Sequence, residues 1–424
     1  MRWKNSLLTL LALPAILLAA GFRINQVGYS AQGPKFAIFA ETYISGACEV
    51  VDATTDEVAH TIEYAFLDAT EDWSALPLPT SRIDFSELTK AGSYYLRAKN
   101  MMGTPFQSEI FVIDDHPLFD QTLALTLDYF YHSRANHPHV WQRDSAVGFY
   151  NAPEKGTRDV RGGWYDASGD LSKNLSHLNY GNFTMPQQIP MSAYIMTDLA
   201  ERIPEQLGKL NILDKMRDEA LWGADYLTRI LDPEGYFYTN IFDNWTGLLN
   251  QREICAFEGS KDTLNLTWYP DFRVGTKTQD WQAAFREGAG VAIATLARIS
   301  QWEQSGDSSS TAYLAAATKA WDHLASNNFA NARAYADDKK LNIIDDITIL
   351  LAATELWKAT QKTTYLDEAE TRVLALNERL HSEGYFIADD SDRPFYHAAD
   401  AGLPIAALSR FLDVHPKSIY SILV

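Results

Sequence analysis

The hydrophobic period changes once along the chain, near Asp114, and this change constrains the fold more than any other feature. Before it, short apolar runs alternate with turn residues, a pattern typical of β-strands. After Pro117 the apolar residues recur with a helical period. Aspartate is a good helix cap and proline suits the first turn of a helix, so a helix is expected to begin here. The clearest strand-like runs are residues 35–40, 46–51, 94–98 and 110–113.

A chain of 424 residues exceeds what one hydrophobic core usually holds, so we expect two domains. Residues 22–115 are expected to form a small β-sandwich and residues 116–424 an all-α domain. The long loops 135–185 and 232–280 have a length that usually builds a functional face. Helices are expected at residues 117–134, 186–203, 213–231, 281–303, 311–326, 345–361, 365–380 and 402–412.

The tetrapeptide Glu-Gly-Tyr-Phe occurs at residues 234–237 and 383–386, each time after an expected helix. Repeated helical hairpins around a toroid would produce such a pattern. Two ordinary helix ends, each followed by aromatic residues that pack into the core, would produce it equally well. The sequence leaves both interpretations open.

The first 21 residues have the order of a secretory signal peptide. Two basic residues precede the apolar run Leu7–Leu18, and small residues follow as far as Gly21. A bilayer span needs about 20 apolar residues, so the shorter run favours cleavage near Gly21 over a permanent anchor. Phe22 rather than a cysteine comes next, which leaves no attachment site for a lipoprotein anchor. We expect loss of residues 1–21 and a periplasmic or secreted protein.

The net charge limits the classes of molecule that the chain is expected to bind. The chain has 36 Lys and Arg against 55 Asp and Glu, a net charge of −19, without a basic cluster that could follow a phosphate backbone. We therefore expect no nucleic-acid partner and, after signal cleavage, no membrane partner, whereas neutral or cationic ligands fit. The two cysteines, Cys48 and Cys255, exclude a disulfide framework and a cysteine-based metal site, and are expected to be free thiols.

The most informative segment reads Arg161-Gly-Gly-Trp-Tyr-Asp-Ala-Ser-Gly-Asp-Leu-Ser-Lys173. Asp166 and Asp170 lie among turn-forming glycines, and Trp164 and Tyr165 offer flat faces on which a sugar ring could stack. Inverting glycoside hydrolysis uses such residues, because one carboxylate activates water while a distant carboxylic acid protonates the leaving oxygen. From the residues alone, a calcium-binding or turn-capping loop has equal weight.

The segment resembles the Gly-Gly-Trp-Tyr-Asp-Ala-Gly-Asp signature of family 9 glycoside hydrolases, the cellulase family. Phe22–Ser30, which reads Phe-Arg-Ile-Asn-Gln-Val-Gly-Tyr-Ser and is followed by Pro34 and Lys35, is similar to the start of the immunoglobulin-like module that precedes many of these catalytic domains. The resemblance implies an immunoglobulin-like β-sandwich and an (α/α)6 barrel. It also implies that Asp170 is the general base, that Asp166 helps to position water, and that the substrate is a β-1,4-linked glucosyl polysaccharide or oligosaccharide.

The chain departs from the family pattern in two ways. Ser168 adds a residue between the two carboxylates, a variant similar to exo-β-glucosaminidases that act on chitosan oligosaccharides, and such amine-bearing sugars suit an acidic protein. The family's general acid, a glutamate close to the C-terminal end of the catalytic domain, has no match. Eight expected helices are also fewer than the twelve of an (α/α)6 barrel, so we expect a barrel truncated at its C-terminal end. An inactive carbohydrate-binding remnant is the competing function.

Weaker candidates lie near two expected helix starts. Arg286 could contact a sugar hydroxyl, although an ion pair that fixes the helix is favoured, and His397 could donate to substrate or be an ordinary loop histidine. If the acid lies in this chain, Glu253 and Glu258 are the first candidates. No organic cofactor is expected, and a calcium ion bound in a loop would be structural. A toroidal polysaccharide lyase is disfavoured, because the net charge of −19 would repel its acidic substrates.

Overall fold

The structure, a computed structural model of the chain, divides into two compact units, the first up to Thr126 and the second from Leu127. The division falls inside helix α1 (Pro117–His132), which begins at the proline that ends the strand pattern. The expected signal peptide lies outside the described residues, except for Gly21. The described residues are 21–40, 44–63, 80–100, 102–167, 169–175, 188–244, 246–266, 269–328, 341–390, 392–395 and 401–416.

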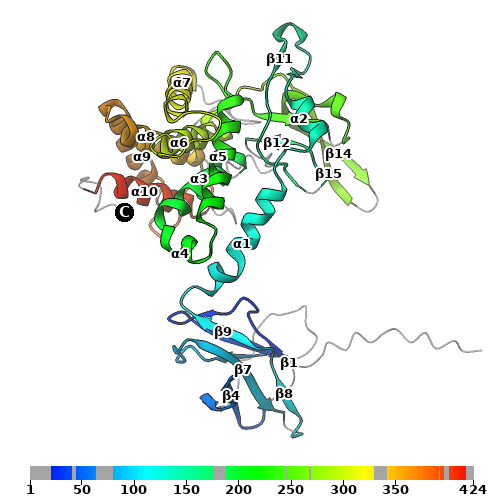
Figure 1. Cartoon of the computed structure of the whole chain (residues 1–424), viewed down its shortest axis with the longest axis vertical. Coiled ribbons are helices and arrows are strands. Elements are labelled where there is room, and N and C mark those ends of the chain that lie inside the picture. The colour runs from blue at the N-terminus through cyan, green and yellow to red at the C-terminus, as the bar shows by residue number, and fades with distance from the viewer. Residues whose placement is uncertain are drawn as a thin grey trace, which may run out of the picture. The chain divides into compact units, whose positions relative to one another are not determined.

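The first unit is a β-sandwich of two sheets (Figure 1). Its smaller sheet has the order β1-β3-β6, with bounds Gly21–Arg23, Phe36–Ala40 and Thr80–Asp84. Its larger sheet has the order β2-β9-β7-β4-β5, with β8 paired to β7, and the bounds are Tyr29–Ser30, Phe111–Asp114, Gly92–Lys99, Ala47–Asp52, Val58–Glu63 and Pro105–Gln107. Side chains of both sheets, among them Phe39, Val50 and Phe111, share one apolar core. The four expected strands are confirmed.

A buried lysine organises the loop between β2 and β3. The Lys35 side chain is 0% exposed, and its Nζ donates to the carbonyl oxygens of Ser30, Ala31 and Gly33 at 3.1, 2.7 and 2.8 Å. Burial lowers the pKa of Lys35. The lysine therefore satisfies three carbonyls that the tight loop would otherwise leave without partners.

The described residues contain all eight expected helices, of which α1 spans the division between the units, and two additional short helices, α2 and α4. The expected helix at 281–303 begins only at Ala289, because Gly288 adopts a left-handed φ of +95° after a short 3-10 turn. In the part of the chain that the structure describes, no helix combines the length and the apolar character that crossing a membrane requires. The bounds from α2 to α10 are Pro138–Asp144, Ile189–Arg202, Pro204–Lys209, Leu213–Arg229, Ala289–Ile299, Ser310–Asn328, Ile343–Thr360, Thr363–Glu378 and Leu403–Val414.

The helices pack as successive hairpins (Figure 1). Helices α3, α6, α8 and α10 lie next to one another in that order, and α5, α7 and α9 each pack against the helix before them in its hairpin. Every residue of α6 is buried, as is α8 from Ile343 to Leu356, so these two helices form the interior of the unit. The sequence pattern of these helices is apolar on all sides for this reason.

Buried ion pairs show that the inner helices run in the same direction. Arg298 of α6 donates to Asp198 and Glu201 of α3 at 2.8 and 2.9 Å. Arg410 of α10 binds both oxygens of Glu355 in α8, at 2.7 and 3.0 Å. Each of these residues lies in the C-terminal half of its helix, so the four N-termini lie together at the other end.

The two Glu-Gly-Tyr-Phe segments form the same turn, one after α5 and one after α9. At residues 232–236 and 381–385 the first N–H donates to the tyrosine carbonyl at 2.8 Å. The N–H groups of Gly235 and Gly384 donate back to the first carbonyl at 2.8 and 2.9 Å, and both glycines have a left-handed φ. This shared geometry after two outer helices supports the interpretation as repeated hairpins.

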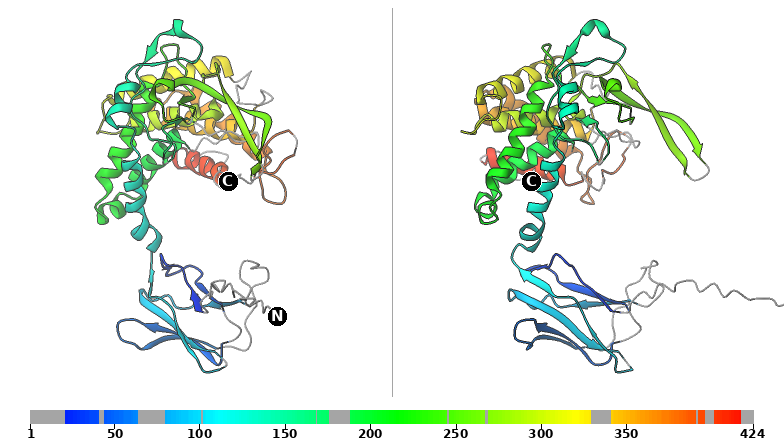
Figure 2. Two further views of the ribbon diagram at one scale, coloured as in Figure 1. Left: turned by 90° about the vertical axis from the view of Figure 1, so that its right-hand side faces the viewer. Right: turned by 45° about the vertical axis from the view of Figure 1, so that its right-hand side comes forward.

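The expectation that the second domain is all-α is wrong, because its long loops carry strands. The hairpin β14–β15 occupies much of the expected loop 232–280 and extends away from the helices (Figure 2). It continues a sheet of order β12-β13-β14-β15, and a smaller pair joins β10 to β11. The bounds from β10 to β15 are Val147–Gly148, Thr157–Arg158, Lys173–Asn174, Asn240–Phe242, Glu253–Leu266 and Tyr269–Thr278.

Candidate active site

Asp166 and Asp170 lie on one closed turn. The Asp170 N–H donates to the Ala167 carbonyl at 3.0 Å, and the Asp166 N–H donates to the Ser172 carbonyl, also at 3.0 Å. Gly169 has a φ of +84°, a conformation that favours glycine. Both aspartates are half-buried. The two backbone hydrogen bonds therefore hold the turn in one shape, and its two carboxylates remain partly exposed to solvent.

The Asp170 carboxylate is held by Ser172. The backbone N–H of Ser172 donates to Oδ1 of Asp170 at 2.8 Å, and the Ser172 hydroxyl donates to the same oxygen. Ser172 itself is buried. These two hydrogen bonds to Oδ1 fix the rotation of the carboxylate, and neither of them involves Oδ2.

A buried cluster of three charged side chains, Asp144, Lys173 and Arg252, lies beneath this turn, and each is 0% exposed. Arg252 donates to the two Asp144 oxygens at 2.6 and 3.2 Å, and Lys173 Nζ lies 2.7 Å from Oδ2 of Asp144. Burial opposes the charge on Asp144, but the two cations outweigh burial and hold its pKa below the usual value. Burial lowers the pKa of Lys173 to about 8.

The same cluster binds the backbone on both sides of the turn. Lys173 donates to the carbonyl of Gly162 at 3.0 Å and to that of Val160, while Arg252 donates to the carbonyl of Leu171. These charge-assisted bonds are stronger than bonds between neutral groups. The cluster therefore supports the carboxylate turn, and this role of Arg252 and Asp144 was not apparent from the sequence.

Trp164 lies in the core of the unit, against α5. Its side chain is 3% exposed, its indole N–H donates to Glu219 at 3.0 Å, and a Cβ added at Gly223 would lie 2.7 Å from its ring. Contrary to the sequence-based expectation, its faces pack against protein and offer no platform for a sugar. Tyr165 is half-buried beside it, and burial raises its pKa.

The glycine pair before Trp164 lets the backbone approach α5 closely. Gly162 and Gly163 have φ values of +97° and +71°, and a Cβ on Gly163 would lie 3.0 Å from the Tyr226 ring. The Trp222 indole donates to the Gly163 carbonyl at 2.9 Å. Other residue types would push the signature segment away from the helix that anchors it.

Arg286 is buried, in the turn before α6, and forms an ion pair with Asp345 at the start of α8. The two side chains are 1% and 2% exposed, so the structure favours the helix-fixing ion pair over a contact with substrate. Burial raises the pKa of Asp345 despite the arginine. His397, the other expected substrate contact, lies outside the described residues.

The two suggested acids lie on strand β14. Glu253 forms an ion pair with Lys277 at 2.8 Å, and for Glu258 the structure describes only the backbone. Within the described ranges, no group of three or more His, Cys, Asp or Glu side chains is placed to hold a metal ion. Both cysteines are free, as the sequence predicted, and the structure shows that both are buried.

Comparisons with known proteins identify both units. The sequence model described as glycosyl hydrolase family 9 matches residues 119–400, and the one described as the cellulase N-terminal ig-like domain matches residues 19–102. A search of curated proteins finds no match.

Solved structures with the same fold are longer than this chain. Bacteroides ovatus GH9 is 18% identical, with 93% of this chain and 73% of that chain covered and a TM-score of 0.54. A thermostable endoglucanase from Alicyclobacillus acidocaldarius, solved as a single mutant, is 16% identical over 84% and 62%, with a TM-score of 0.53. AaCel9A, solved with a cellobiose-like isofagomine, is 14% identical over 95% and 68%, with a TM-score of 0.58.

At these identities the structural likeness establishes the fold alone. The family match rests on the sequence itself and covers well over half of the chain, including the complete carboxylate turn. The sandwich module that precedes it is a second, independent match in the order in which the two units occur here. The chain therefore belongs to glycosyl hydrolase family 9.

Proposed function

We propose that the chain is an exported, inverting glycoside hydrolase acting on β-1,4-linked glucosyl polysaccharides or oligosaccharides. One observation carries the proposal: two half-buried carboxylates share a closed turn, and one of them has its rotation fixed by Ser172. A general base must be held in place and reach solvent, and Asp170 meets both requirements. The order of residues 1–21 supports export.

In the proposed mechanism, Asp170 removes a proton from the water that attacks the anomeric carbon, while Asp166 orients that water. A carboxylic acid on the other side of the glycosidic bond protonates the leaving oxygen. Glu253 is engaged by Lys277, and we assign the acid to no described residue. The hairpins α3–α5, α6–α7 and α8–α9, followed by α10, are proposed to be consecutive parts of an (α/α)6 barrel.

The names of two similar structures support a cellulase-like substrate, since one is an endoglucanase and another was solved with a cellobiose-like isofagomine. A second candidate is exo-β-glucosaminidase activity on chitosan oligosaccharides. The additional residue Ser168 in the sequence between the two aspartates resembles the exo-β-glucosaminidase branch, and the net charge of −19 favours this candidate, because glucosamine units are cationic.

The test is an incubation of the full chain with cello-, chitosan- and chitin-oligosaccharides, with products and their anomeric form followed by NMR. We expect cleavage of the cello-oligosaccharides with inversion, and release of single sugars from chitosan oligomers would instead establish the second candidate. Retention of configuration would contradict the proposed mechanism. Binding without cleavage of any substrate would support a carbohydrate-binding remnant.

A further inference from the structure

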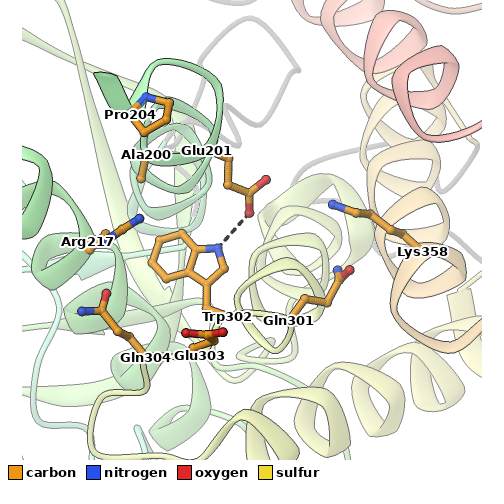
Figure 3. Close-up of a pocket in the computed structure, with 9 residues that line it drawn as sticks. All are labelled: Ala200, Glu201, Pro204, Arg217, Gln301, Trp302, Glu303, Gln304 and Lys358. Carbon is orange, nitrogen blue, oxygen red and sulfur yellow. Dashed lines mark hydrogen bonds between the residues drawn. The ribbon is translucent and has the colours of Figure 1, made fainter. Parts of the chain in front are cut away.

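A cavity lies at the end of the inner helices that is remote from the carboxylate turn. It has a volume of about 620 Å³ and is lined by the C-terminal part of α3, the segment after α6, and side chains of α5 and α8 (Figure 3). Leu175, which follows the carboxylate turn in sequence, lies at the opposite, N-terminal end of α6. A Cβ added at Gly288, just before α6, would lie 2.5 Å from the Leu175 carbonyl oxygen. The eleven residues of α6 separate the two places by about 16 Å.

An oriented tryptophan forms the centre of this cavity. The Trp302 indole N–H donates to Glu201 at 2.8 Å, and Glu201 also accepts from the buried Arg298 at 2.9 Å. Burial raises the pKa of Glu201, but Arg298, Trp302 and Lys358 outweigh burial and bring it below the usual value. Trp302 is only half-buried and its ring lines the cavity, so its orientation is fixed while part of its surface stays accessible. An aromatic surface of this kind suits the C–H face of a sugar ring.

The polar groups around Trp302 are balanced in charge. Arg217 and Lys358 point into the cavity from two sides, and the carboxylates of Glu201 and Glu303 offset them (Figure 3). The carboxamide of Gln304 adds both a donor and acceptors. Neighbouring hydroxyl groups pair well with the planar, two-pronged side chains of Arg217 and Gln304, whereas a charged ligand would leave a charge of the lining uncompensated.

We propose that this cavity is a secondary binding site for a short, neutral, β-linked gluco-oligosaccharide, separate from the carboxylate turn. The volume lies within the roughly 300–1,000 Å³ of small-molecule sites. Trp302 carries the sugar ring, and Arg217, Lys358 and Gln304 bind its hydroxyl groups. The choice of a glucosyl ligand rests on the proposed function, whereas the site itself rests on the cavity. Such a site keeps a substrate chain on the enzyme between cleavage events.

The test uses the full chain with Asp170→Asn, so that the ligand is not consumed, and cellotetraose as the probe. Hydrogen exchange of the peptides that cover residues 298–304 is measured against cellotetraose concentration, and residues 161–175 report the carboxylate turn separately. We expect saturable protection at 298–304. Lys358→Met and Arg217→Met should each weaken it about tenfold, because each removes a charged donor. The matched control Lys362→Met makes the same change four residues further along, after the end of α8, at an exposed position outside the cavity, and should leave protection unchanged.

Absence of protection at 298–304 at millimolar cellotetraose would overturn the inference, as would equal protection in Lys358→Met and Lys362→Met. Tighter binding of a cationic chitosan tetramer would overturn the assignment to a neutral ligand. Hydrolysis by the unsubstituted chain is measured in parallel. If residues 298–304 are protected while no oligosaccharide is cleaved, the proposed function fails and the secondary site stands.

Discussion

Each unit of the molecule ties one loop to a buried lysine, but the two lysines have different partners. Lys35 in the sandwich donates to three carbonyl oxygens, and within the described residues it forms no ion pair with a carboxylate. Lys173 in the helical unit donates to two carbonyls and also pairs with Asp144, which it shares with Arg252. The first arrangement closes a turn, whereas the second holds a turn that carries two carboxylates.

This difference has energetic consequences. Breaking a buried ion pair leaves a charge without compensation, which costs more than the loss of a bond to a carbonyl. Substitutions in the Asp144 cluster should therefore disturb both stability and catalysis, and substitutions at Lys35 should disturb stability alone.

The largest effect is expected from Asp170→Asn. We predict that turnover falls by about 10²- to 10⁴-fold, the usual contribution of a general base, while thermal unfolding is unchanged. Asp166→Asn should have an equal or milder effect. Asp159→Asn, in the same loop but paired with Arg161, is the control and should leave turnover unaltered. Near-normal hydrolysis by Asp170→Asn would refute its role, and a greater loss at Asp166 would mean that the two aspartates have exchanged roles.

Arg252→Met should destabilise the second unit by about 3–5 kcal/mol, because it leaves Asp144 buried with one cation instead of two and removes the partner of the Leu171 carbonyl. Denaturant unfolding with a probe in each unit measures this, and the sandwich should be unaffected. Arg202→Met removes only the solvent-exposed pairs with Asp198 and Asp413 and should cost less than about 1 kcal/mol. Equal losses in the two variants would show that the cluster has no special importance.

Lys35→Met and Lys173→Met compare the two loops directly. Lys35→Met leaves buried carbonyls without their donor and should cost about 1–3 kcal/mol in the sandwich. Lys173→Met also removes a cation from the buried Asp144 and should cost about 3–5 kcal/mol in the second unit. Only Lys173→Met should also lower turnover, by about tenfold, because the carboxylate turn loses part of its support. Steady-state kinetics on the folded fraction separate the two effects. A fully active Lys173→Met chain would show that Arg252 alone is sufficient to hold the turn.

The pH dependence of stability should report Lys173. Burial lowers its pKa in the folded chain from 10.5 to about 8, so between these values the unfolded chain binds the additional proton. The free energy of unfolding contributed by this group therefore rises with pH from about 8 to about 10.5, by at most about 1.4 kcal/mol per pH unit. Lys173→Met should lose this rise. Identical slopes in the two chains would contradict the assignment.

The smallest effect concerns the two thiols, which provide one probe in each unit. Cys48 and Cys255 are 0% exposed, and burial raises the pKa of each to about 12, so both should react slowly with thiol reagents in the folded chain. Arg252→Met should accelerate the labelling of Cys255 and not that of Cys48. Parallel acceleration at both would mean that the two units unfold together.

Several site residues could be located from the sequence, but their partners could not. Trp164 was placed beside the carboxylates and expected to stack on a sugar, whereas its indole binds Glu219, 55 positions away. Arg286 was expected to form an ion pair that fixes its helix, but the partner, Asp345 on another helix, could not be identified from the sequence. The hairpin β14–β15 was missed because glycine, charged and polar residues interrupt its alternation, and its pairing register shifts twice.

The sequence by itself determined the change from strands to helices at Pro117, the approximate positions of the eight expected helices apart from the start of α6, and the turn residues around Asp166 and Asp170. These features depend on residues a few positions apart, through hydrophobic period, capping and glycine conformation. Only the tertiary structure decided what holds that turn, since Arg252 reaches Asp144 across 108 positions and the Leu171 carbonyl across 81. A buried charge is stabilised by an opposite charge that lies close to it in the folded chain. The residues around it in the sequence do not indicate which distant residue provides that opposite charge.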